Sequence, residues 1–523
     1  MQRSLILLAP TILTLTAYSQ SAPDIQWQHT LGGSNLDAAS SIQRTSDGGY
    51  ILAGVTQSNN GDVSGNHGGN DFWVVKLDAD GVIQWQKTLG GSDSDLARSV
   101  QQTTDGGYVL TGSSPSTDGD VTGGHGGTDV WVVKLDPDGT VVWEETYGGA
   151  DSDDGSAIQQ TSDGGYIVAG LSRSVDGDVS GNHGGPDAWV LKLGIDGDLQ
   201  WQKCLGGSDY DAAYSIQQTS DDGYIMAGET GSNDGDVSGN HGGEGTDCWI
   251  VKLDGSGNLQ WQRALGGSGT DVAESIRQTN DGGYIMAGYS NSNDGDVTGN
   301  LGGSDFWMSR LDDMGNIQWQ RSLGGSSDDY AGNVQLVSDS GYVVTGETES
   351  QDGDLTANHG DRDAWVFRLN IEGTLVWQKA LGGSANDSGT AIELDNDGGY
   401  TMAGWSDSND GDVTGNHGGR DCWVVKLDPE NVGIPELTDA ASFSLFPNPS
   451  ADAVNITFNL ASAAVVKLQV YDAQGLLVKT VVDEKASPGE RTLHYSTEHL
   501  PAGTYELRLV SGNSTITKRL VKL

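Results

Sequence analysis

Short apolar runs separated by glycine-rich polar loops fill residues 25–427, and their order repeats along the chain. In the first copy, 41–45 and 49–54 are rich in Ile, Tyr and Thr, and an Asp-Gly pair between them favours a β-hairpin. A second hairpin is expected where 72–77 meets 83–86. No stretch has the apolar spacing of a surface helix. Each copy therefore predicts four antiparallel strands, which we name A to D in chain order.

The copies follow one another at nearly constant spacing. A Trp in strand D recurs every 58 residues, except for one interval of 60 where Glu244 and Gly245 lengthen a loop. The recurring residues are Trp27, Trp85, Trp143, Trp201, Trp261, Trp319 and Trp377. Repeated four-stranded units of this length are typical of propeller blades. The sequence thus predicts an all-β chain with a seven-bladed β-propeller.

The two ends of the repeat region are complementary. The first strand, 25–30, is a strand D with no preceding A, B or C, whereas the last copy ends at Leu427 without its own strand D. We therefore expect the N-terminal strand to pair with the last blade and close the propeller, which leaves no open sheet edge. The three cysteines (Cys204, Cys248 and Cys422) are expected to be unpaired, because the blades hold at least two of them far apart.

The composition changes at both ends of the repeats. Arg3, the apolar run 5–15 and Ala17-Tyr18-Ser19 have the pattern of a secretory signal with its cleavage site, and no later segment is apolar enough to span a membrane. After the repeats, short alternating strands predict a small immunoglobulin-like β-sandwich. The expected domains are a signal peptide at 1–19, the propeller at 20–428, a linker at 429–442 and the sandwich at 443–523.

About the last 80 residues also carry a family signature. They contain FSLFPNPS, VYDAQGLLV, PAGTY running into ELRLV, and the ending KRLVKL. This region resembles the C-terminal sorting domain of the type IX (Por) secretion system of Bacteroidetes. The resemblance implies a partner in the type IX machinery, secretion to the extracellular space or the outer-membrane surface, and cleavage or surface anchoring of the exported chain. The residues that carry the sorting signal would be Pro447, Asn448, Pro449, Gly503, Tyr505, Lys518 and Lys522. The alternative is an ordinary accessory immunoglobulin-like module.

Charge is distributed unevenly between the two regions. The chain has a net charge of −46, yet residues 443–523 contain eight Lys and Arg against seven Asp and Glu. The negative charge therefore belongs to the propeller. Binding to nucleic acid requires Lys and Arg to neutralise phosphates, so nucleic acid is not expected as a partner.

Acidic loops recur at one end of every blade. The D–A loop, which precedes strand A, places Asp37, Asp95, Asp153, Asp211, Asp271, Asp329 and Asp387 at one position. In a propeller, the D–A and B–C loops emerge on the same face. We expect this face to bind the ligand, with the seven D–A carboxylates around the mouth of the central channel.

The long B–C loop contributes two further aspartates per blade. One set is Asp62, Asp120, Asp178, Asp236, Asp296, Asp354 and Asp412, and the other is Asp71, Asp129, Asp187, Asp247, Asp305, Asp363 and Asp421. Three interpretations of the acidic loops stay open. The carboxylates cap turns, or the two B–C sets bind Ca²⁺, which is a possible cofactor, or the acidic face attracts a cationic ligand.

Six B–C loops also carry a histidine. These are His67, His125, His183, His241, His359 and His417, and blade five has Leu301 at this position. Because Leu can replace it, we expect the histidine to have a structural role.

The repeats favour binding over catalysis. A catalytic centre needs different groups at one point, whereas near-identical blades offer the same groups seven times, and no GxSxG, HExxH or phosphate-loop motif is present. The leading interpretation is a secreted or cell-surface binding or adhesion protein whose ligand is a polysaccharide or a protein. The alternatives are a secreted polysaccharide-acting hydrolase or lyase, and a structural surface-layer protein.

Overall fold

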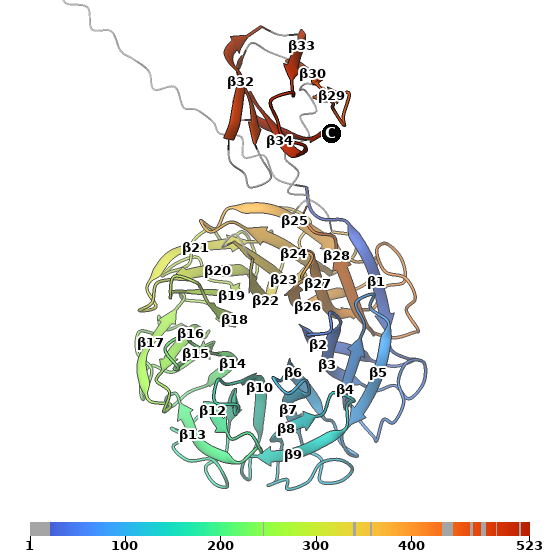
Figure 1. Cartoon of the computed structure of the whole chain (residues 1–523). Coiled ribbons are helices and arrows are strands. Elements are labelled where there is room, and N and C mark those ends of the chain that lie inside the picture. Colours follow the sequence, from blue (N-terminus) through green and yellow to red (C-terminus); the bar gives the residue numbers. More distant parts are fainter. Residues whose placement is uncertain are drawn as a thin grey trace, which may run out of the picture. The chain divides into compact units, whose positions relative to one another are not determined.

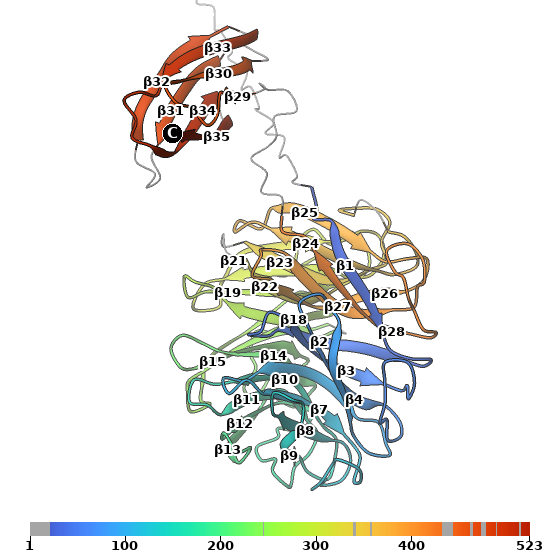
Figure 2. The same ribbon diagram turned by 45° about the vertical axis from the view of Figure 1, so that its right-hand side comes forward.

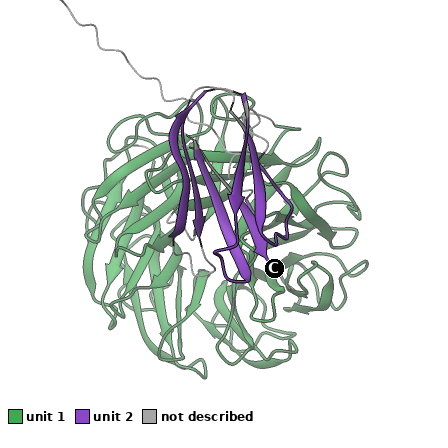
Figure 3. Cartoon of the chain, turned by 45° about the horizontal axis from the view of Figure 1, so that its top comes forward, with its two compact units in different colours: residues 1–429 green, residues 430–523 purple. Residues whose placement is uncertain are grey.

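The computed structural model describes residues 21–430 and 443–523, with short gaps at 244, 338–340, 356–357, 461–463, 472–476, 488 and 512–513. The expected signal peptide at 1–19 and most of the expected linker at 429–442 lie outside the described residues. The chain divides into two compact units, residues 1–429 and 430–523, which Figure 3 colours separately. Throughout the described ranges, the regular elements are β-strands.

The first unit contains seven four-stranded antiparallel sheets around a central opening (Figure 1). Blade one is β2 (Asp37–Arg44), β3 (Tyr50–Thr56), β4 (Asp71–Leu77) and β5 (Ile83–Leu89). Blade two is β6 (Leu96–Gln102), β7 (Tyr108–Ser114), β8 (Asp129–Leu135) and β9 (Val141–Tyr147). Blade three is β10 (Asp153–Gln160), β11 (Tyr166–Ser172), β12 (Asp187–Leu193) and β13 (Leu199–Leu205).

The remaining blades follow the same order. Blade four is β14 (Asp211–Gln218), β15 (Tyr224–Thr230), β16 (Asp247–Leu253) and β17 (Leu259–Leu265). Blade five is β18 (Asp271–Gln278), β19 (Tyr284–Ser290), β20 (Asp305–Leu311) and β21 (Ile317–Leu323). Blade six is β22 (Asp329–Leu336), β23 (Tyr342–Thr348), β24 (Asp363–Leu369) and β25 (Leu375–Leu381). The predicted seven-bladed β-propeller is confirmed, with strand A of each blade nearest the central opening (Figure 1).

Blade seven combines strands from the two ends of the propeller. It consists of β26 (Asp387–Leu394), β27 (Tyr400–Ser406), β28 (Asp421–Leu427) and β1 (Ile25–Leu31). Strand β1 runs antiparallel to β28, from Ile25 opposite Leu427 to Leu31 opposite Cys422. The inner strand of blade one, β2, contacts β26 and β27 of blade seven. The N-terminal strand therefore occupies the outer position that the last repeat lacks.

Apolar side chains fill the spaces between neighbouring blades. Strands B and C are buried along nearly their whole length, because each is covered on both faces by adjacent blades. The strand-C Trp of each blade, such as Trp73, is almost fully buried, and its indole N–H donates to the Gln86 side chain of strand D at 3.0 Å. The strand-D Trp27 of blade seven packs edge-on against Tyr50 of blade one. The paired tryptophans thus join blades to one another.

The second unit is a two-sheet β-sandwich (Figure 2). One sheet consists of β29 (Ser444–Phe446), β30 (Ala453–Leu460) and β33 (Gly489–Ser496). The other consists of β32 (Leu477–Ala486), β31 (Ala464–Tyr471), β34 (Gly503–Ser511) and β35 (Ser514–Lys522). Val454, Ile456, Leu468 and Leu507 are among the side chains buried between the sheets.

Two further observations concern the cysteines and membrane-spanning helices. The three cysteines are free and buried. Within the described ranges, the chain contains no helix with the length and apolar character that crossing a membrane requires.

Candidate functional site

A buried aspartate at the start of each inner strand organises the loops above it. Asp37 has no exposed surface, and its carboxylate accepts hydrogen bonds from the hydroxyls of Thr56 and Ser58 and from the Gly33 N–H. Burial raises the pKa of Asp37, although these hydrogen bonds act in the opposite direction. The same three bonds are made by Asp95, Asp153, Asp211, Asp271, Asp329 and Asp387.

This burial alters the expected ligand face. The seven D–A carboxylates lie beneath the loops and accept bonds from loop donors, so they are not displayed to solvent around the mouth of the channel. Their geometry is that of turn caps, the first of the three interpretations of the acidic loops.

The two aspartate sets of the B–C loops meet between neighbouring blades, with a histidine between them. His67 Nδ1 lies 2.9 Å from Asp71 Oδ2 in its own blade, and His67 Nε2 lies 3.9 Å from Asp120 Oδ2 in the next blade. Histidine–aspartate contacts within the blade recur at His125, His183, His241, His359 and His417. The rings of His67, His125, His183, His241 and His417 also lie 3.6–4.0 Å from an aspartate of the next blade. A structural role of the histidines stays a prediction.

The calcium interpretation concerned the same two aspartate sets. Among the residues described, no group of three or more His, Cys, Asp or Glu side chains has an arrangement that could hold a metal ion. Calcium binding at these loops therefore stays a prediction, and the geometry of the loops adds no ligand cluster in its support.

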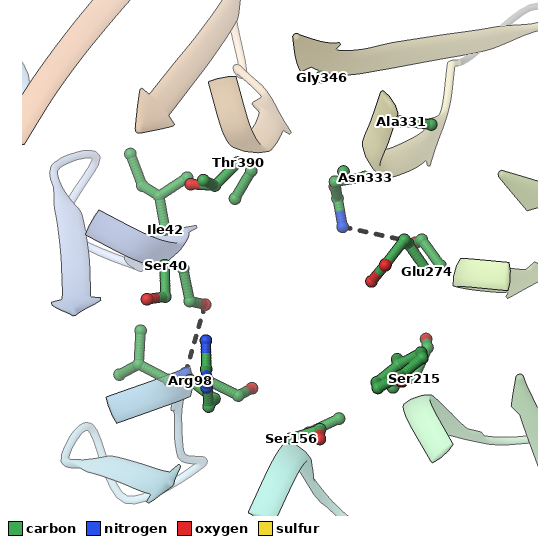
Figure 4. Close-up of a pocket in the computed structure, with 18 of the residues that line it drawn as sticks. Ser40, Ile42, Arg98, Ser156, Ser215, Glu274, Ala331, Asn333, Gly346 and Thr390 are labelled. Carbon is green, nitrogen blue, oxygen red and sulfur yellow. Dashed lines mark hydrogen bonds between the residues drawn. The ribbon is translucent and has the colours of Figure 1, made fainter. Parts of the chain in front are cut away.

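A cavity of about 1000 Å³ occupies the centre of the propeller and is lined by the inner strands of all seven blades (Figure 4). Each inner strand has a β-bulge at the same place. In blade one, Ala39 pairs with Gly54 and Ser41 pairs with Ala53, which leaves Ser40 without a partner in β3. A bulge of this kind redirects one side chain out of the regular sheet pattern. Here the bulge residues line the channel.

The residues at the bulges form a ring that we call the bulge ring. It consists of Ser40, Arg98, Ser156, Tyr214, Glu274, Gly332 and Thr390. Six residue types occupy these seven equivalent positions, although the D–A aspartate three residues earlier is the same in every blade. The bulge ring is therefore a part of the repeat in which the blades differ in chemistry.

A second variable position lies near the mouth, directly after the glycine of strand B. It holds Val55, Ser113, Leu171, Glu229, Tyr289, Glu347 and Trp405. The sequence-based interpretation relied on the groups that all blades share and did not identify either position as a variable set, although Trp405 stands out in the sequence as an extra Trp of blade seven. Comparing the seven copies with one another, position by position, would have found them.

The polar groups of blade four form a connected cluster. The hydroxyl of Tyr214 donates to Glu229 Oε1, and the hydroxyl of Thr246 donates to Glu229 Oε2. Tyr210 lies beside Tyr214, with 3.2 Å between their hydroxyl oxygens. Both oxygens of Glu229 therefore have partners within their own blade.

The arginines near the mouth in blades six and seven are also paired within their blades. Arg362 donates to Glu347 and Glu349. Arg420 donates to Asp407, and its guanidinium lies over the Trp405 ring, 3.3 Å from the ring centroid. These pairs fix aromatic and charged side chains beside the channel without leaving the arginines free to bind an anion.

The predicted sorting residues come together in the second unit. Asn448 donates through its side-chain amide to the Arg519 carbonyl at 2.7 Å and accepts the Val521 N–H at 2.9 Å. Pro447 and Pro449 flank this asparagine, Lys518 and Lys522 lie on the strand that it holds, and Gly503 begins β34. The Tyr505 hydroxyl donates to the Pro501 carbonyl at 2.8 Å. The two ends of the sequence signature thus form one structural feature.

A family model confirms the resemblance of this region. Residues 444–523 match the model described as the secretion system C-terminal sorting domain. The protein is therefore exported by the type IX secretion system to the cell surface or the extracellular space, and its C-terminal domain interacts with the secretion machinery.

Similarity outside the sorting domain is weak. Regulatory protein FlaEY of Caulobacter vibrioides is 27% identical over 192 residues, which cover 33% of this chain and 20% of that protein. Sqt1 from Chaetomium thermophilum is 12% identical, with a TM-score of 0.38 over 72% of this chain and 83% of the other. PorZ, a surface component of the type IX secretion system of Porphyromonas gingivalis, is 11% identical, with a TM-score of 0.24 over 98% and 87%. At these values, the similarities carry no argument about function.

Proposed function

We propose that this exported propeller is a binding protein that takes an extracellular polymer, a polysaccharide or a protein, at the mouth of its central channel. The observation that carries the proposal is the bulge ring. The framework of the blade is repeated seven times, whereas the side chain that each bulge directs into the channel changes from blade to blade. Function in repeat folds is commonly placed on variable positions of a rigid scaffold.

The composition of the channel wall suits a polar ligand. Among its lining residues are Arg98, Asp154, Tyr214, Asn333 and Trp405, which together offer charge, hydrogen bonds and aromatic faces. Binding sites in general combine aromatic contact area with a few placed polar groups. The proposed ligand face is still the face of the D–A and B–C loops, but the contacts come from the bulge ring and its neighbours, and the buried aspartates support them.

The experiment obstructs the channel without disturbing the blades. The mature full-length protein and its Ser156→Trp variant are applied to a glycan array and to a panel of extracellular matrix proteins. Because Ser156 is a small bulge-ring residue, an indole at this position occupies channel volume. Thr104→Trp adds the same side chain at an exposed hairpin on the other face and serves as the control.

The proposal expects a ligand that wild type and Thr104→Trp bind and that Ser156→Trp loses. Equal binding by all three proteins would place the ligand outside the channel. Incubation of the bound polymer with wild type tests the alternatives: steady release of shortened chains would indicate a hydrolase or lyase. An absence of ligand, together with self-assembly into sheets, would indicate a surface-layer protein.

A further inference from the structure

Glu274 is the acidic member of the bulge ring, and its carboxylate has no partner. In the described part of the chain, it makes no hydrogen bond and no ion pair, although its side chain is mostly covered and lines the channel (Figure 4). Glu229 of the adjacent blade shows the contrast, because both of its oxygens accept hydroxyl hydrogen bonds. A partly buried carboxylate without a donor is costly, and a ligand cation would compensate for it.

The electrostatic surroundings of Glu274 favour a cation. Burial and the neighbouring Glu229 raise the pKa of Glu274 to about 7, and Arg98 on another blade acts in the opposite direction. Arg98 belongs to blade two and Glu274 to blade five, so the two charged members of the bulge ring come from well-separated blades. A positive group placed beside Glu274 would favour the ionised carboxylate. The net charge of −46 also draws cations towards the protein.

Aromatic rings adjoin this carboxylate. Tyr289 pairs with Val272, two residues before Glu274 on the same strand, and both burial and the Glu274 carboxylate raise the pKa of Tyr289. The Tyr289 and Tyr330 rings pack edge to face with centroids 4.9 Å apart, and Tyr214 occupies the neighbouring bulge. A carboxylate beside tyrosine rings is a favourable environment for an ammonium group, which is attracted to the charge and to the ring faces.

The rest of the wall offers groups that suit hydroxylated rings. Ser40, Ser156 and Thr390 supply hydroxyls from the bulge ring, Asn333 supplies an amide, and Trp405 supplies a broad aromatic surface. Hydroxyl and amide groups exchange hydrogen bonds with sugar hydroxyls, and indole packs against the apolar face of a pyranose. This mixture favours a glycan over a polypeptide as the carrier of the cation.

We propose that the channel mouth binds a glycan with free amino groups and that Glu274 receives one of its protonated amines. The proposal rests on the binding function proposed above and adds the ligand class and the residue that selects it. Arg98, in the same ring, is placed to receive an acceptor group of the ligand elsewhere in the channel.

The test uses glucosamine oligosaccharides in their free-amine and fully N-acetylated forms. Their affinities for the mature full-length protein are measured by calorimetry near pH 7, where a substantial fraction of the Glu274 carboxyl group is ionised. We expect the free-amine form to bind about tenfold or more tightly than the acetylated form, as loss of a charge-assisted hydrogen bond implies. Glu274→Gln should remove this preference. Glu372→Gln makes the same change in charge on an exposed hairpin and should retain it.

The outcomes separate this inference from the proposed function. If both sugars bind equally, and Ser156→Trp abolishes their binding, the channel is a glycan site but the amine proposal is wrong. If a lysine oligopeptide binds through Glu274 and the amino sugar does not, the glycan assignment is wrong. If Glu274→Gln keeps the preference for the free amine, another group receives the cation. If no polymer binds at the channel, the proposed function itself fails.

Discussion

Asp305 accepts the backbone N–H of Leu301 at 2.7 Å but has no imidazole beside it, because Leu301 replaces the histidine of the other six blades. Burial raises the pKa of Asp305 to about 7, and the carboxylate of Asp329 in the next blade acts in the same direction. In blade two, the ring of His125 lies 3.7 Å from Asp129, and burial raises the pKa of Asp129 to about 6. The imidazole contact therefore favours the ionised carboxylate at this position.

The substitution Leu301→His should stabilise the propeller. The folded-state pKa of Asp305 lies above its ordinary value, so the free energy of unfolding falls as pH rises from about 4 to 7. A histidine that contacts Asp305 should recover part of this loss, about 1 kcal/mol at pH 6 for one unit of pKa. Thermal melting checks the gain. His359→Leu in blade six should produce the opposite shift, and a lower melting temperature for Leu301→His would contradict the role given to the imidazole.

The whole propeller should be most stable at mildly acidic pH. Burial raises the pKa of many carboxyl groups, among them Glu393 to about 7. The free energy of unfolding therefore falls as these buried groups ionise between about pH 4 and pH 7. The pKa of His183 is lowered by burial and raised by the hydrogen bond to Asp187, with a net increase. The contact of the protonated imidazole with Asp187 stabilises the folded protein at low pH, and this stabilisation is lost as pH rises through the folded-state pKa of His183. Both kinds of group favour the folded state at lower pH.

The hairpins between strands A and B determine how the stability of the propeller falls at low pH. Although burial acts against it, hydrogen bonds from Thr45 and the buried Lys76 lower the pKa of Asp47 to about 2. This contribution is complete above about pH 4 and is lost as pH falls towards 2. Urea denaturation should therefore give its highest midpoint near pH 4.5, below the neutral range. A midpoint that rises steadily to pH 8 would contradict this expectation. Added salt is the control, because it screens repulsion between exposed charges but has little effect on the buried groups.

The repeat pattern predicted the blades because strands B and C must be apolar on both faces when they lie between neighbours. Strand A was predicted too short, at 41–45, whereas β2 begins at Asp37. Its first residues, Asp37, Ala38 and Ala39, are small or acidic and have the composition of a loop. The hydroxyls that satisfy Asp37 lie 19 and 21 residues later, so nothing near the aspartate in the sequence indicates its burial.

The bulge ring was missed for a related reason. A bulge inserts one residue without changing the apolar pattern on either side, so Ser40 and Glu274 have the same sequence context as ordinary strand residues. Only pairing with strand B defines which residue is extra. The contact between His67 and Asp120 is similarly absent from the local pattern, because it joins loops of two different blades.

Removal of residues 20–31 should destabilise the propeller. Without β1, the edge of β28 is exposed, and Trp423 loses the Gln28 side chain that accepts its indole N–H at 2.9 Å. We expect a large fall in melting temperature or loss of soluble protein. Removal of 20–22 alone, which leaves β1 intact, is the control. A synthetic peptide of residues 24–32 should restore the melting temperature by strand addition, and an unchanged transition in the truncated protein would show that β1 contributes little.

Asn448 should be required for a stable sorting domain, because its side-chain amide bonds two backbone groups of the terminal strand, the Arg519 carbonyl and the Val521 N–H. Asn448→Ala removes both bonds and should cost about 1–2 kcal/mol. Asn448→Asp keeps the acceptor for the Val521 N–H but places a carboxylate oxygen against the Arg519 carbonyl, so it removes one bond and retains the other. Hydrogen exchange at the Val521 amide measures this directly, with faster exchange in Asn448→Ala than in Asn448→Asp. Since the machinery acts on this domain, Asn448→Ala should also lower the fraction of protein at the cell surface. If both variants show the same amide protection and the same export as wild type, Asn448 is required neither to hold the terminal strand nor for sorting.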